Sequence, residues 1–200
     1  MKHVAENKYL ICYKTTEMTE QVYIAILRGI NVAGKNTVAM EHLKQLFSEN
    51  GFEGAVTYIQ SGNVVFKSAV AKDQLAALIS RAIEVRFQLN IHVILVTKNE
   101  MGNIIKDNPF LEEKDVDEEK LHVTILEKNP DPENLKAIQN LDFKPDRFIV
   151  KNNVVYLYCP NGYGKTKLSN TFFENKLKIK ASTRNWRTIN KLIELASQFN

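Results

Sequence analysis

Residues 22–36 read VYIAILRGINVAGKN, an apolar run that passes directly into a loop holding two glycines, two asparagines and two cations. The run has the length and composition of a buried strand. Apolar residues at helical spacing follow the loop and stop at Asn50-Gly51; they are Met40, Leu43, Leu46 and Phe47. A strand, a glycine-rich connection and a helix therefore open the fold, and the connection is the strongest candidate for a ligand site.

Further along, apolar runs separated by turn-forming residues predict strands at 55–59 and 63–68 around a hairpin. An amphipathic helix is expected over 75–83, and a strand at 91–96. The order βαββαβ is the ferredoxin-like plan. The second half repeats that order, with strands expected at 121–126, 147–151, 154–159 and 179–183, helices at 132–141 and 168–177, and a last helix at 185–197. Asn152-Asn153 has the composition of a two-residue hairpin turn.

The sequence thus predicts an α+β protein of two tandem ferredoxin-like units, with mixed, mainly antiparallel sheets and an extra C-terminal helix. Residues 1–20 are polar and unpatterned, and we expect a disordered extension there. The expected divisions that follow are 21–98 for the first unit, 99–119 for a helical and acidic linker, and 120–200 for the second unit with the last helix.

Each βαββαβ unit leaves one sheet face uncovered by its own two helices. We expect the two faces to be buried against each other, or under the segment 99–107 and the last helix. Trp186, Ile189 and Ile193 lie at helical spacing, so they are predicted to pack on a sheet face.

Composition favours a soluble protein with a substantial core, because 44% of the 200 residues are apolar and 25% are charged. The chain has no apolar run near the roughly 20 residues of a membrane span, and no signal-peptide pattern, so we expect a cytoplasmic protein without a membrane partner. Cys12 and Cys159 make no disulfide framework or Cys-x-x-Cys pair. The four histidines lack ligand spacing, and no metal site is expected.

The net charge of +4 is unevenly distributed, since residues 160–200 carry 8 basic against 2 acidic groups. This segment, together with the basic first loop, could form a face that attracts anions. A solvated surface with charges of both signs is the alternative.

The loop nearly matches the phosphate-binding pattern Gly-x4-Gly-Lys-Ser/Thr, but Asn36 stands where a hydroxyl would hold magnesium. This departure disfavours a nucleotide hydrolase and leaves a weaker hypothesis, a phosphate or carboxylate held by the loop. Alternatively, the glycines only permit positive φ in a long connection. The residues proposed to bind the anion are Arg28 and Lys35 for charge, Gly29 and Gly34 for close backbone approach, and Asn31 and Asn36 for orienting amides.

A second basic loop, residues 161–167, contains Gly164-Lys165-Thr166, but Cys159 stands where the phosphate-binding pattern needs its first glycine. Lys165 and Lys167 precede a helix, where the macrodipole disfavours cations, so an anionic partner would explain them. A solvated loop is the alternative. The two lysines join the predicted ligand-binding set.

Two further groups are secondary candidates. Gln60, Ser61 and Asn63 suit a simple hairpin turn. We also expect this hairpin and the loop 28–36 to lie at opposite ends of their strands, which would prevent them from sharing one site. Arg184, Trp186 and Arg187 could stack bases, although helical spacing makes Trp186 a core anchor first.

Four blocks of the sequence together resemble a bacterial family known only as domain of unknown function 1697. The blocks are residues 28–36, 58–66, 161–170 and 183–188. The similarity extends from about Val22 to the end of the chain. The resemblance implies a fold and no activity.

The leading hypothesis is a cytoplasmic protein that binds a small phosphate- or carboxylate-bearing ligand through loops 28–36 and 161–167. One alternative is nucleic-acid binding by the basic C-terminal segment. Another is an enzyme of unidentified chemistry. The sequence shows no paired carboxylates and no nucleophile with a base, so enzyme status and cofactor are left open.

Overall fold

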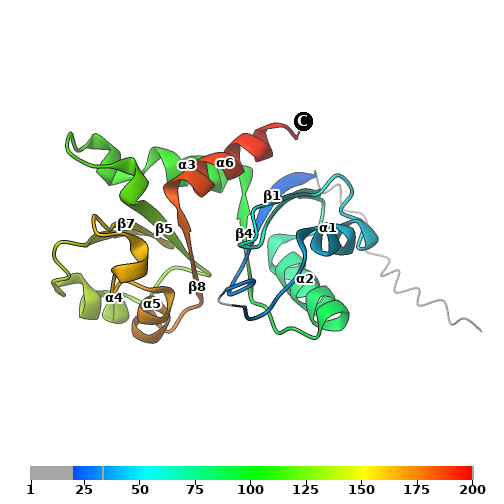
Figure 1. Ribbon diagram of the computed structural model, residues 1–200, viewed down its shortest axis with the longest axis horizontal. Helices are drawn as coiled ribbons and strands as arrows, with labels where there is room; N and C mark the ends of the chain where they lie inside the picture. The colour runs from blue at the N-terminus through cyan, green and yellow to red at the C-terminus, as the bar shows by residue number, and fades with distance from the viewer. Residues whose placement is uncertain (1–19, 33, 200) are drawn as a thin grey trace, which may run out of the picture.

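The computed structural model of the protein describes residues 20–32 and 34–199. It contains two four-stranded sheets that face each other across a central core (Figure 1). The predicted extension at 1–20 lies outside the described residues except for Glu20.

The first unit contains β1 (Gln21–Leu27), α1 (Met40–Glu49), β2 (Val56–Tyr58), β3 (Asn63–Ser68), α2 (Lys72–Phe87) and β4 (Val93–Thr97). Its strand order is β2-β3-β1-β4. Each neighbouring pair runs antiparallel, with Ile24 of β1 opposite Val65 of β3 and Val96 of β4. This is the ferredoxin-like arrangement.

The second unit contains β5 (Leu121–Leu126), α4 (Pro132–Gln139), β6 (Arg147–Lys151), β7 (Val154–Tyr158), α5 (Asn170–Leu177) and β8 (Ala181–Asn185). Its order, β6-β7-β5-β8, repeats that of the first unit, and its neighbouring strands are also antiparallel. The prediction of two tandem ferredoxin-like units is confirmed. The strand pairs described are all antiparallel, so the sheets are not mixed.

Three further segments complete the chain. Helix α3 (Lys98–Lys106) begins at a capping box formed by Thr97 and Glu100. The 3-10 helices η1 (Pro109–Glu112) and η2 (Glu118–Lys120) follow it, and α6 (Trp186–Ser197) ends the fold. Helices α3 and α6 lie above the two sheets, while α1 with α2 and α4 with α5 cover the outer faces (Figure 1).

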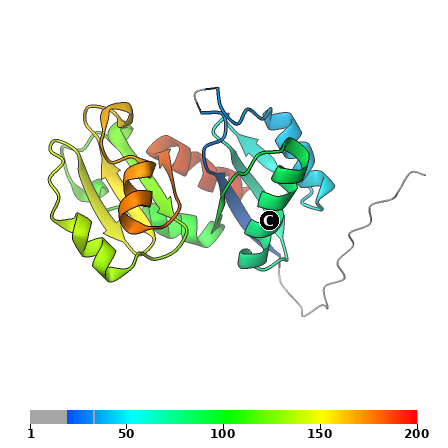
Figure 2. The same ribbon diagram turned by 90° about the horizontal axis from the view of Figure 1, so that it is seen from below.

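The central core takes apolar side chains from both inner sheet faces and from α3 and α6. Seen from below, α6 lies where the two units meet (Figure 2). Trp186 is 4% exposed and Ile189 is fully buried, while Ile193 packs at the margin of the same core. The prediction that the last helix packs on a sheet face is confirmed.

Helix α2 extends beyond the predicted 75–83 at both ends, to Lys72 and Phe87, and two boundaries around β8 also differ from the prediction. Lys178 ends α5 in the left-handed conformation, with φ of 57°, and buried Ile179 belongs to the turn that follows. The strand therefore occupies Ala181–Asn185 instead of 179–183. Ser169 caps α5 by accepting a hydrogen bond from the Phe172 N–H, so this helix starts at Asn170 instead of 168.

No helix among the described residues is long and apolar enough to cross a bilayer.

Candidate functional site

The loop 28–36 is closed by its own asparagine side chains. Asn31 Nδ2 donates to the Val38 and Gln60 carbonyls, each at 2.9 Å, and its Oδ1 accepts from the Val38 N–H at 2.8 Å. Asn36 Nδ2 donates to the Gly29 carbonyl at 2.9 Å. These amides therefore shape the loop; both donors of Asn31 Nδ2 are occupied, and Asn36 Nδ2 uses one of its two.

The loop backbone is also partly bonded to itself. The Asn31 N–H donates to the Asn36 carbonyl at 3.1 Å, and the Lys35 N–H donates to the Val32 carbonyl at 2.9 Å. Gly29 and Gly34 have φ of 74° and 75°, as a turn of this kind requires. The N–H groups of Asn31 and Lys35 are therefore not free to bind a phosphate.

The β2–β3 hairpin lies at the same end of the sheet as the loop 28–36. The Leu27 N–H donates to the Gly62 carbonyl at 2.9 Å, and Asn31 Nδ2 reaches the Gln60 carbonyl. The expectation that the two blocks lie at opposite ends is wrong. Because β3 lies between β1 and β2 and is antiparallel to both, β1 and β2 run in the same direction and end at the same edge.

Gly62 is required by this close approach. A Cβ on Gly62 would lie 2.2 Å from Ile30 Cγ2 and 3.0 Å from Leu27 Cβ, and its φ is +70°. We expect Gly62→Ala to lower the free energy of unfolding by about 2–4 kcal/mol, since it adds overpacking to backbone strain. Gly54→Ala is the matched control, because Gly54 has φ +73° and open space at its Cβ. If denaturant unfolding gives equal losses for the two variants, the close contact at Gly62 contributes nothing.

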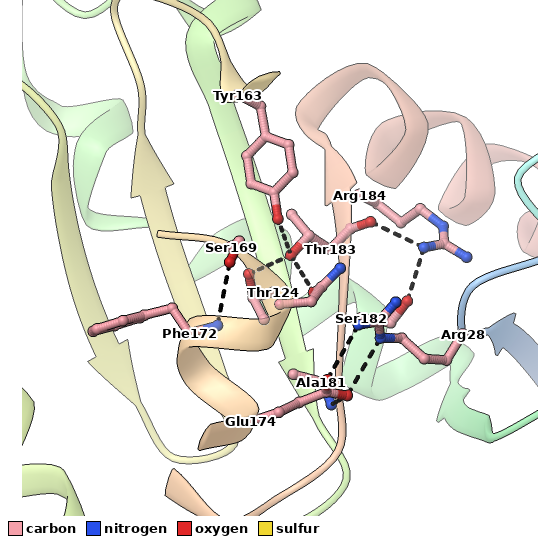
Figure 3. A network of polar contacts seen from close by, with 11 residues as sticks. Arg28, Thr124, Tyr163, Ser169, Phe172, Glu174, Ala181, Ser182, Thr183 and Arg184 are labelled. Atoms are coloured by element: carbon pink, nitrogen blue, oxygen red, sulfur yellow. Dashed lines mark hydrogen bonds and ion pairs between the residues drawn. The ribbon is translucent and has the colours of Figure 1, made fainter. Parts of the chain in front are cut away.

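Arg184 of β8 joins the second unit to this end of the first. Its Nε donates to Asn63 Oδ1 at 2.6 Å, and its Nη2 donates to the carbonyls of Leu27 at 3.1 Å, Ser61 at 2.8 Å and Gly62 at 3.4 Å. Its Nη1 donates to Ser182 Oγ and to the Thr183 carbonyl, each at 2.9 Å (Figure 3). The side chain is buried and fully hydrogen-bonded, but these partners are all uncharged.

Arg28 makes a second tie between the units. Its Nε and Nη2 donate to the two Glu174 carboxylate oxygens at 3.3 and 3.1 Å, and Glu174 also accepts from the Ala181 N–H at 3.2 Å (Figure 3). Both side chains keep some contact with solvent, at 26% and 19% exposure. His92 and Glu127 form a third contact nearby, with Nε2 and Oε1 3.3 Å apart.

The electrostatics of this region are unbalanced, because Arg28 is paired with the Glu174 carboxylate while Arg184 has no carboxylate partner among the described residues. Burial, followed by the charge of Arg28, lowers the pKa of Arg184 to about 10, so the group stays cationic near neutral pH. We call the group of Arg28, Glu174, Arg184 and Asn63 the seam cluster.

A hydroxyl network in the second unit adjoins the seam cluster. Thr183 Oγ1 receives a hydrogen bond from the Tyr163 hydroxyl at 3.0 Å and donates to Asn170 Oδ1 at 2.7 Å (Figure 3). Because its single proton goes to Asn170, the 2.7 Å contact with Thr124 must be donated by Thr124. The Thr183 hydroxyl is thus saturated, and the network positions Tyr163 from loop 161–167.

The predicted lysines do not gather with the seam cluster. Lys35 is exposed in its loop. Lys165 and Lys167 line a separate groove of about 500 Å³ with Asn161 and the segment 142–146. The structure therefore brings loops 28–36 and 161–167 to one region through Arg28 and Tyr163, not through their lysines.

Of the secondary candidates, some contact the seam cluster and the others lie elsewhere. Ser61 and Asn63 contact Arg184, while Gln60 bonds to Asn31 through its carbonyl. Trp186 packs in the central core and donates from Nε1 to Glu118 at 3.1 Å, so its ring is not an exposed platform for a base. Arg187 is exposed on α6.

Glu174 was not singled out by the sequence, because one carboxylate in a short amphipathic helix has no distinguishing pattern. Cys159 is buried, and burial raises its pKa to about 11, so the thiol stays protonated near neutral pH. Within the described residues, no cluster of three or more His, Cys, Asp or Glu side chains could hold a metal ion.

The fold defines an α+β protein built from two ferredoxin-like units around one inter-unit seam. A family model described as "Protein of unknown function (DUF1697)" matches residues 20–156, and the chain belongs to this family. The resemblance noted in the sequence is thereby confirmed. The match ends within β7, so the blocks 161–170 and 183–188 lie beyond it.

One solved structure is that of the conserved bacterial protein SP0830 from Streptococcus pneumoniae. It is similar at a TM-score of 0.70 with 22% identity, over 89% of this chain and 99% of that chain. At this identity the likeness shows the fold alone. Comparison with curated proteins found no match.

Proposed function

We propose that the protein binds a small anionic ligand, bearing a carboxylate or phosphate, at the seam cluster. The observation that supports this function is that, of two neighbouring guanidiniums, Arg28 is paired with the Glu174 carboxylate while buried Arg184 has only uncharged partners. A cation that is poorly compensated inside a protein stabilises any anion that can reach it, because water screens it weakly there.

Arg28 is the residue that would bind the anion directly. Its side chain is partly exposed, and its Nε–Nη2 edge has the fork geometry that recognises carboxylate and phosphate oxygens. Glu174 occupies this edge in the free protein. The ligand would displace the Glu174 carboxylate, which keeps its hydrogen bond from the Ala181 N–H.

The remaining predicted residues have indirect roles in this proposal. Gly29, Gly34, Asn31 and Asn36 fix the loop that follows Arg28. Lys35, Lys165 and Lys167 are exposed cations that would raise the local potential and speed the approach of an anion. Arg184 would contribute only its positive charge to the site, because its N–H donors are already hydrogen-bonded within the protein.

The test is a thermal-shift series with phosphate, sulfate, citrate and nucleoside phosphates. A ligand at 100 times its dissociation constant stabilises a protein by about 2.7 kcal/mol, which for this size corresponds to roughly 5–10 °C. We expect Arg28→Ala to abolish the shift and Glu174→Gln to increase it, since the second change removes the competing carboxylate. Arg81→Ala is the matched control, because Arg81 is exposed on α2.

The opposite signs expected for the two seam variants make the test specific. If a ligand raises the melting temperature equally in wild type, Arg28→Ala and Glu174→Gln, the anion is bound elsewhere and the proposal fails. Steeply salt-dependent binding of oligonucleotides, without any response to small anions, would instead favour the nucleic-acid hypothesis.

A further inference from the structure

A crevice of about 210 Å³ opens between the two units on the side of α3, away from the seam cluster. Its floor is apolar apart from one phenol, and all of its residues except Leu95 belong to the central core. The floor residues are Leu95 and Val96 of β4, Ile104 of α3, Ile125 of β5, and Val154 and Tyr156 of β7. Both units therefore contribute to one small hollow with an apolar floor and a polar rim, the kind of inter-unit position that ligand sites favour.

The floor has no polar group that requires a partner. The Tyr156 hydroxyl donates to the Ile104 carbonyl at 3.1 Å. Burial and the nearby Asp107 charge raise the pKa of Tyr156 to about 12, so the phenol stays neutral. A cavity of roughly 150 Å³ with apolar walls accepts a benzene-sized molecule. This hollow thus has room for an apolar side chain of that size.

The rim of the crevice carries four charged side chains that balance. Lys72 Nζ lies 2.7 Å from both Glu100 carboxylate oxygens, so these two groups neutralise each other. Lys151 Nζ donates to the backbone carbonyl of Asp107 at 2.8 Å, not to its carboxylate. Within the described residues, the Asp107 carboxylate has no hydrogen bond or ion pair, and Lys151 has no carboxylate partner.

We infer that this crevice binds an α-amino acid with an apolar side chain. The Asp107 carboxylate receives the ligand's ammonium, Lys151 receives its carboxylate, and the side chain fills the apolar floor. A ligand with a single charge would satisfy only one of the two open rim groups. A zwitterion satisfies both and adds no net charge to a rim that already balances, which limits the cost of desolvation.

The experiment measures binding of L-leucine and L-phenylalanine to the full chain by calorimetry, and compares two leucine analogues. The first, 4-methylpentanoate, lacks the ammonium, and the second, 3-methylbutylamine, lacks the carboxylate. We expect each analogue to bind at least about tenfold more weakly than leucine, since each loses a charge-assisted hydrogen bond. L-glutamate should not bind, because its side chain cannot enter the apolar floor.

Variants of the rim test the assignment of each charge. Asp107→Asn should weaken leucine binding about tenfold or more while leaving 4-methylpentanoate binding unaffected. Lys151→Met should weaken leucine binding by a similar factor while leaving 3-methylbutylamine binding unaffected. Lys114→Met and Asp115→Asn are matched controls on the exposed linker. Arg28→Ala should leave leucine binding unchanged, so this site and the seam cluster can fail independently.

Three outcomes would overturn the inference. They are the absence of leucine and phenylalanine binding at 10 mM, equal affinity for leucine and either analogue, and leucine binding that Asp107→Asn and Lys151→Met leave intact. Both rim groups changed here, Asp107 and Lys151, are exposed, so circular dichroism should show that the variants keep their fold.

Discussion

Replacing Arg184 by alanine is expected to lower the free energy of unfolding by about 3–5 kcal/mol, the scale of removing one member of a buried polar network. The guanidinium accounts for the hydrogen bonds of Asn63 Oδ1 and of the Leu27 and Ser61 carbonyls across the seam. Alanine would leave these acceptors buried without donors and would open a cavity between the two units. Urea unfolding measures the loss.

Arg187→Ala is the matched control for this variant. Arg187 lies three positions further along the chain but is exposed, and we expect a change within about 0.5 kcal/mol. Arg184→Lys should fall between the two, because lysine keeps the charge but cannot bond to Asn63 and the carbonyls of β1 and the hairpin at once. If Arg184→Ala is as stable as Arg187→Ala, the seam is held by the central core and not by this residue.

The order of elements could be predicted from the sequence because it depends on local signals. The Asn152-Asn153 turn is an example, since Asn152 takes φ of 54°, as a two-residue hairpin requires. The glycine-rich loop and the Asn50-Gly51 stop likewise marked the ends of β1 and α1. Boundaries failed where a turn residue is itself apolar and buried, as Ile179 is before β8.

The seam cluster could not be predicted, because its contacts join residues far apart in the chain. Arg184 lies 121 residues from Asn63, and Arg28 lies 146 residues from Glu174. One signal was present in β8 itself. Its sequence, ASTRN, has no large apolar residue, although four of its five side chains are buried or half-buried. A strand of that composition indicates polar partners on both faces.

The position of the hairpin was predicted wrongly for a topological reason that the sequence does contain. Once the order βαββαβ is accepted, β1 and β2 must run in the same direction, so the β1–α1 loop and the β2–β3 turn share one edge. Two of the four blocks that resemble the family, residues 28–36 and 58–66, are therefore neighbours. Their main contact is structural, through Asn31 and the Gln60 carbonyl, and Arg184 binds the same edge.

Truncation after Asn185 is expected to abolish cooperative folding while leaving β8 and Arg184 in the chain. It removes α6, which buries Trp186, Ile189, Leu192 and Ala196 in the central core. Loss of one buried tryptophan or leucine side chain costs about 2–5 kcal/mol. Several such losses together approach the 5–15 kcal/mol, roughly, that stabilises a whole domain.

The physical reason is that α6 covers the inner faces of both sheets at once. Without it, apolar residues of β1, β3 and β5 would meet water, and the truncated chain should bind a dye for exposed hydrophobic surface and lose its sharp thermal transition. Leu192→Ala in the full chain is the graded control, with an expected loss of about 2–5 kcal/mol and retained cooperativity. A truncated chain that stays soluble and cooperative, with unchanged stability, would mean that α6 is an appendage. The α6 start, where Arg187 is already exposed, would then be a better candidate for recognition than the seam.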